Sequence, residues 1–147
     1  RDYLRPPRVY WYIYPSGISA MTCPKVVVDV CLRNDWECDG ERATLRLAGG
    51  RHQVLSFEPF LLDGDDMLRI VTAVGPVAAL SAIQLNAVLG LNSSLAYGAL
   101  AIAGDTLTMV DTFLLSGDCH DQLARAMHFM AETADRYERE IYHTDVN

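Results

Sequence analysis

The sequence predicts an α+β protein, an antiparallel sheet packed with helices in the order α-β-β-β-α-β-β-α. Three observations support this class. The last third of the chain repeats apolar residues at helical spacing, two groups of β-rich runs turn at glycines, and a long uncharged stretch separates the groups. Because hairpins join antiparallel strands, we expect an antiparallel sheet.

The N-terminal region is predicted to be an arm (1–22), followed by one α+β domain (23–147). Val9–Tyr14 (VYWYIY) is dense in aromatic and β-branched residues and is typical of a strand. Its four rings would suit either a ligand-stacking platform or, as we prefer, an edge strand with one packed face. Lys25–Trp36 is ambiguous, because its valines favour a strand while its apolar spacing suits a helix; we expect a helix.

Glycines and acidic turns delimit the first three strands. Ala43–Leu47 and Gln53–Phe57 are joined through Gly49 and Gly50, which allow positive φ angles. An acidic turn at 63–66 then precedes Met67–Val74, the third predicted strand.

No charged residue occurs between Arg69 and Asp105. Pro76 suits a first helical position, so a helix covered on both sides is predicted from Pro76 to about Leu89. A transmembrane span is the alternative, but polar residues interrupt the run and no basic cluster flanks it. Asn86, inside this apolar helix, could contact a ligand, but we expect its amide to bond a neighbouring backbone group.

A second hairpin and a long helix complete the chain. Leu95–Ala103 and Thr106–Leu114 turn at Gly104-Asp105, and the helix follows from Ser116 or Asp118. Its predicted buried stripe is Leu123, Met127, Met130, Ala134, Tyr137 and Ile141. Three ion pairs are expected on the opposite face, namely Asp121–Arg125, Glu132–Arg136 and Asp135–Arg139.

Composition restricts the possible partners and compartment. The net charge of −7 argues against nucleic acid and anionic membranes as partners. Four cysteines are too few for a secreted disulfide scaffold, and no signal peptide is visible, so a reducing cytoplasm is expected. The acidic balance suits neutral or basic partners.

Candidate chemistry is weak throughout. Cys119 and His120 are neighbours that point about 100° apart on a helix, so they do not form a nucleophile–base pair. The cysteine spacings lack a zinc knuckle, and the acidic turn lacks the ligands of a calcium loop. We therefore predict no catalytic residue, no metal site and no cofactor.

From about Val26 onward the chain resembles the type III secretion chaperone-like fold, which YbjN-like domains share. The residues that carry the resemblance are Asn34-Asp35-Trp36, Leu85-Asn86, the hairpin LAYGALAIAGDTLTMVDTFLL and the run Cys119–Tyr142 with its aromatic Tyr137. The resemblance implies a non-enzymatic domain that binds a polypeptide and forms a homodimer. The alternative is a small-molecule sensor or an enzyme with an unrecognised pocket.

We expect the partner on a sheet face of the second hairpin. Thr108, Val110 and Thr112 alternate onto one side of the last strand, where threonine and valine suit a surface that is wet when free. Phe129 and Met130 on the closing helix are expected at its rim.

Overall fold

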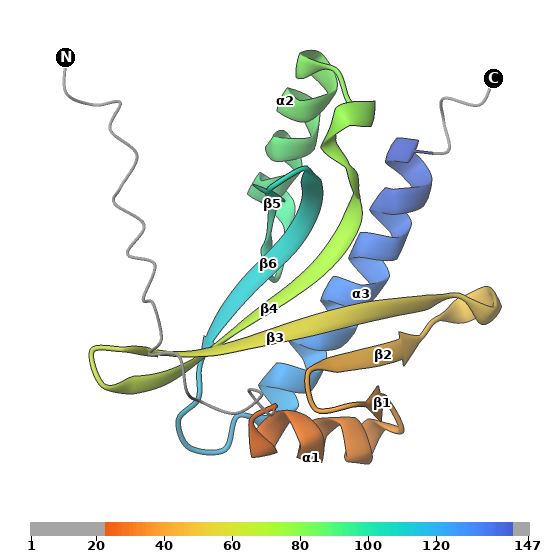
Figure 1. Cartoon of the computed structure of the whole chain (residues 1–147). Helices are drawn as coiled ribbons and strands as arrows, with labels where there is room; N and C mark the ends of the chain where they lie inside the picture. The colour runs from red at the N-terminus through yellow and green to blue at the C-terminus, as the bar shows by residue number, and fades with distance from the viewer. Residues whose placement is uncertain (1–22, 143–147) are drawn as a thin grey trace.

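The computed structural model describes residues 23–142, so the predicted strand Val9–Tyr14 lies outside the described part of the chain. The fold is α+β, as predicted (Figure 1). In chain order the elements are α1 (Lys25–Asn34), β1 (Glu37–Cys38), β2 (Arg42–Arg46), η1 (Ala48–Gly50), β3 (His52–Leu62), β4 (Asp65–Pro76), η2 (Val77–Ala79), α2 (Ala82–Gly90), η3 (Leu91–Ser94), β5 (Ala99–Ala103), β6 (Thr106–Leu114) and α3 (His120–Tyr142).

The strands form one six-stranded sheet in the order β1-β2-β3-β4-β6-β5. Every neighbouring pair is antiparallel, which confirms the predicted sheet type. Figure 1 shows α3 lying along the sheet behind β3 and β4, with α1 beneath its first turns and α2 beside β5. The register places β6 between β4 and β5, so the segment from η2 to η3 carries the chain around to the sheet edge.

Lys25–Asn34 is a helix, in agreement with the apolar spacing rather than with the β propensity of its valines. Val27, Val30 and Cys31 are buried against the rest of the molecule. Packing of this face outweighs the few tenths of a kcal/mol that each β-branched residue costs a helix. Asp35 ends the helix in the left-handed conformation, with φ of 56°.

The hairpin of β3 and β4 is longer than predicted. β3 continues beyond Phe57 to Leu62, and β4 begins at Asp65 rather than at Met67. Pro59 interrupts the apolar pattern of β3. Because β2 pairs only with residues 52–56 of β3, Pro59 lies where β3 has a neighbouring strand on one side alone, and proline is tolerated there. β1 was not predicted, because its two residues are too few to produce an alternating pattern.

The core lies between the sheet and the apolar stripe of α3. On the helix, the five stripe residues from Leu123 to Tyr137 are buried as predicted, and Ile141 is half-buried. The sheet contributes Leu45, Leu55, Leu68, Ile70, Leu107 and Met109, all fully buried. Burial of each such side chain contributes about 1.5–3 kcal/mol, so this layer provides most of the stabilisation of the described fold.

The expected ion pairs of α3 form only in part. Asp135 and Arg139 are 3.3 Å apart, whereas Asp121–Arg125 and Glu132–Arg136 do not pair in the described structure. Asp135 is buried and also accepts a hydrogen bond from Nε of Arg51, so the pair belongs to a network between the helix and the start of β3.

The prediction of a buried helix from Pro76 to Leu89 is wrong. Pro76 ends β4, and α2 begins only at Ala82, where Ser81 and Gln84 form a capping box. Val88 is the only buried residue of α2, while Ile83 is 82% exposed. The physical reason is position: a helix beside the sheet edge contacts the sheet through one side only.

Among the described helices, none has both the length and the apolar content needed to cross a bilayer.

Candidate functional site

The sheet has one face that α3 covers and one face that residues 23–142 leave mostly open. Because side chains alternate along a strand, the buried Leu107 and Met109 face α3, and Val110 and Thr112 face the other side. We call this second side the open face. Strand register places its residues in rows that cross several strands.

Two rows of the open face are mainly apolar. The first row pairs Val71 with Val110 and continues to Ser56 and Ala99. The second row consists of Phe60, Met67 and Leu114, of which Leu114 is 48% exposed. Val110 and Leu114 are four residues apart on one strand, which separates the two rows by about 13 Å.

A charged pair lies between the apolar rows. Arg69 Nη1 is 3.4 Å from Glu58 Oε2, and its guanidinium lies 4.9 Å from the ring centroid of Phe60. Thr112 occupies the same row on β6. Because the two charges are paired, a polypeptide that contacts both apolar rows lies over an ion pair and not over a single charge. The open face can therefore accept an apolar polypeptide without burying an isolated ion.

A hollow adjoins the open face at the end of β6. Thr112, Leu114, Tyr97, Cys119 and other residues line a cavity of about 520 Å³. Its position beside Leu114 offers space for one large side chain of a partner.

The structure separates the residues that were predicted as one recognition surface. Val110 is half-buried and Thr112 is exposed, and both lie on the open face. Thr108 shares that side but is 4% exposed, and its hydroxyl donates to the carbonyl of Ala101, so it is not accessible. Phe129 packs against Tyr97 instead, with ring centroids 5.6 Å apart.

The prediction that Met130 lies at the rim of that surface is wrong. Met130 is fully buried in the core, because it belongs to the apolar stripe of α3 that faces the sheet. α3 covers the opposite side of the sheet, so neither Met130 nor Phe129 borders the open face. The residues that the sequence analysis missed are Phe60, Met67 and Leu114. The turn at Asp63–Asp66 could have indicated them, because it joins β3 to β4 and places Phe60 opposite Met67 if β3 continues past Pro59.

The segment from α2 to η3 presents a second exposed apolar region, which we call the α2 surface. Ile83 and Leu89 are exposed, and the segment carries no charge. Asn92 holds the segment to the sheet edge: its Oδ1 accepts from the Leu100 N–H at 2.6 Å and its Nδ2 donates to the Leu100 carbonyl at 3.1 Å. This amide occupies the backbone groups that an added strand would use at Leu100. Asn86, expected to make such a backbone contact, is instead exposed.

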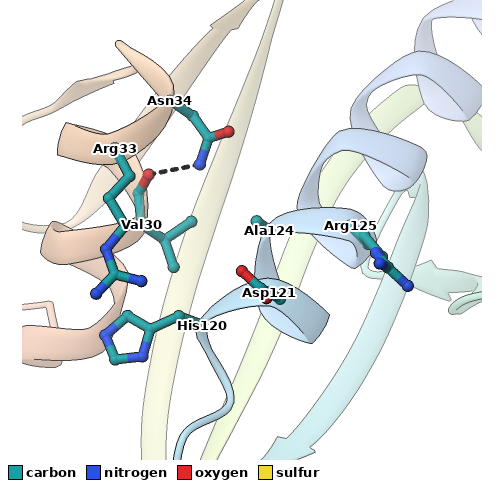
Figure 2. Close-up of a pocket in the computed structure, with 7 residues that line it drawn as sticks. All are labelled: Val30, Arg33, Asn34, His120, Asp121, Ala124 and Arg125. Carbon is teal, nitrogen blue, oxygen red and sulfur yellow. Dashed lines mark hydrogen bonds between the residues drawn. The ribbon is translucent and has the colours of Figure 1, made fainter.

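A charged groove separates α1 from the start of α3 (Figure 2). Its volume is about 400 Å³, and Figure 2 shows side chains entering it from both helices. The groove is lined by Val30, Arg33, Asn34, His120, Asp121, Ala124 and Arg125. Asn34 does not point a free amide into it, because its Nδ2 donates to the Val30 carbonyl at 2.9 Å.

His120 lies between two carboxylates at this groove. Its Nδ1 is 2.7 Å from Asp118 Oδ1, and its Nε2 is 3.5 Å from Asp29 Oδ2. The hydrogen bond with His120 lowers the pKa of Asp118, and the hydrogen bond from Lys25 is the main cause of a lowered pKa at Asp29. Since both ring nitrogens are occupied by carboxylates, neither is available to activate the thiol of Cys119.

Among residues 23–142, no three histidine, cysteine, aspartate or glutamate residues are arranged to hold a metal ion.

No protein-family model matches the chain, and no curated protein is significantly similar to it.

Proposed function

We propose that the protein is a non-enzymatic domain that binds a polypeptide on its open face and forms a homodimer through the α2 surface. One observation carries the proposal: large apolar side chains lie on two regions that the described residues leave uncovered. Leu114 represents the first region and Ile83 the second. Exposed apolar clusters of this kind are typical of protein interaction sites.

The partner chemistry follows from the open face and from the charge of the chain. The apolar rows suit a segment with two apolar side chains about 13 Å apart, which is four residues of extended chain. The net charge of −7 favours neutral or basic residues around these anchors. The resemblance of the sequence to type III secretion chaperones, which act on another polypeptide, implies a similar function, and we propose the cytoplasm as the location.

The α2 surface is proposed as the dimer contact because it lacks charge and lies beside the sheet edge. A symmetric dimer would bring two copies of α2 together and cover Ile83, the most exposed apolar residue of this helix. The second row of the open face, with Leu114, would remain accessible in each copy, because β5 pairs only with residues 106–110 of β6 and this row lies beyond them.

A selected peptide tests the polypeptide-binding proposal. A random peptide library is displayed and selected on the immobilised protein, and the affinity of an enriched peptide is measured by titration calorimetry. Leu114→Asp and Val110→Asp place a charge in the second and first apolar rows. Each is expected to weaken binding by more than about 5-fold, the effect of losing one buried anchor of more than about 1 kcal/mol.

Leu32→Asp is the matched control, because Leu32 is an equally apolar residue on α1 and is 76% exposed. It is expected to leave the peptide affinity unchanged. If all three variants bind the peptide as tightly as the wild type, the open face is not the binding surface. Val110 is half-buried, so the more exposed Leu114 provides the decisive variant if Val110→Asp fails to fold.

A further inference from the structure

Three cysteines from separate segments converge between α1 and β1. Cys23 precedes α1, Cys31 lies within it, and Cys38 belongs to β1. Cys23 and Cys31 belong to the buried core cluster, Cys38 packs against that cluster, and the Cys38 thiol lies close enough to both to raise their pKa values. The backbone N–H of Cys23 also donates to the carbonyl of Gly40, which holds Cys23 beside the turn that follows Cys38. Cys38 is therefore the common neighbour of the other two.

The three thiols differ in their access to solvent. Cys23 and Cys31 are buried, while Cys38 is half-buried. Burial, followed by the proximity of Cys38, raises the pKa of Cys23 and of Cys31 to about 12. The thiolate is the reactive form, and the raised pKa values keep Cys23 and Cys31 protonated. A soluble reagent therefore modifies the more accessible Cys38 first.

We propose that Cys38 and Cys23 form an intramolecular disulfide when the protein meets a small-molecule disulfide such as glutathione disulfide. The Cys38 thiolate attacks one sulfur of glutathione disulfide, forming a mixed disulfide and releasing one glutathione thiolate. Cys23 then loses its proton to solvent and attacks the Cys38 sulfur, releasing the second glutathione. The two protein thiols are oxidised by two electrons, and one glutathione disulfide is reduced to two thiols.

Cys23 is the resolving partner because it can move and Cys31 cannot. A disulfide requires the sulfurs to approach to about 2.05 Å with a dihedral angle near ±90°. Cys31 is fixed within α1, and its carbonyl accepts the Trp36 N–H at 2.9 Å. Cys23 lies before the first turn of the helix, whose first hydrogen bonds are accepted by Pro24, so a shift of its Cα breaks no helical hydrogen bond and strains only its own N–H bond to the Gly40 carbonyl. The cross-link would tie the start of α1 to β1.

Tryptic mapping tests this assignment, because cleavage after Arg8, Lys25, Arg33 and Arg42 places the three cysteines in separate peptides. These peptides are residues 9–25, 26–33 and 34–42. The folded wild-type protein is incubated with glutathione disulfide, alkylated and digested without reduction. The expected product is the cross-link between 9–25 and 34–42, which disappears after treatment with dithiothreitol.

Variants separate this cross-link from its alternative. Cys31→Ala should still form it, and Cys38→Ser should abolish it and leave Cys23 unmodified. A cross-link between 26–33 and 34–42 as the main product would overturn the assignment of Cys23. A mixed disulfide with glutathione at Cys38 that never resolves would overturn the proposal as a whole. The same incubation in urea provides the control, in which folded-state proximity is lost and the cross-link should form at least several-fold less.

Discussion

Replacing Asp135 by alanine should destabilise the fold by about 2–3 kcal/mol, because Asp135 joins α3 to the start of β3. The carboxylate is 3% exposed and contacts two guanidinium groups, Arg51 Nε through Oδ1 and Arg139 Nη2 at 3.3 Å through Oδ2. Removing one partner of a fully buried ion pair costs about 3–5 kcal/mol, because a charge remains buried and unpaired. Here the arginine side chains are 38% and 53% exposed and can turn to water. The cost is therefore nearer to that of losing charged hydrogen bonds, about 1.5–3 kcal/mol.

Urea unfolding followed by circular dichroism measures this loss, with protein concentration held constant across variants. Asp135→Asn keeps one acceptor oxygen and should lose about half as much as Asp135→Ala. Glu132→Ala is the matched control on the same helix, because Glu132 is exposed and contacts only the exposed His128, at 3.4 Å. Its expected loss is under about 1 kcal/mol. If Asp135→Ala costs no more than Glu132→Ala, the network does not stabilise the helix as argued.

Two further predictions concern a close contact and the buried thiols. A Cβ on Gly75 would overlap the ring of Tyr142, so Gly75→Ala should displace that ring, break its hydrogen bond to the Pro76 carbonyl and lower the free energy of unfolding by about 1–3 kcal/mol. In a protein that already carries Tyr142→Ala, the same change should cost much less, and additive losses in the double variant would contradict the overlap. Burial raises the pKa of Cys23 and of Cys31 to about 12. Because the unfolded chain loses these protons at lower pH than the folded protein, their contribution to stability is present below pH 9 and is lost as the pH rises towards 12. A melting temperature that stays constant from pH 8 to 11 would contradict the burial of the two thiols.

Much of the fold could be predicted because its signals are periodic. The stripe of α3 repeats over many turns, and the turn at Gly104-Asp105 separates two regularly alternating runs. α2 could not be placed because an uncharged run is compatible with a buried helix and with an exposed interface helix. Only the tertiary position of α2 beside β5, held by Asn92, distinguishes the two.

The candidate site could be predicted only in part, for a similar reason. Alternation correctly places Val110 and Thr112 on one side of β6, but it does not state which neighbouring strands share that side. Phe60 and Met67 join Leu114 through the register of three strands, and register depends on contacts between residues far apart in the chain. The cysteine cluster was not predicted, because the spacings of Cys23, Cys31 and Cys38 match no known ligand pattern and only the packing of α1 against β1 brings the three together.

The claim that the uncovered apolar side chains serve protein contacts is tested most directly by the mass of the protein in solution. Light scattering after gel filtration, at a loading concentration well above 10 µM, should show twice the 16.3 kDa of one chain. Ile83→Asp should convert it to a monomer with an unchanged circular dichroism spectrum, while Leu32→Asp, at a similarly exposed apolar residue on α1, should remain dimeric. A wild-type mass of 16.3 kDa under these conditions would contradict the proposed role of the α2 surface.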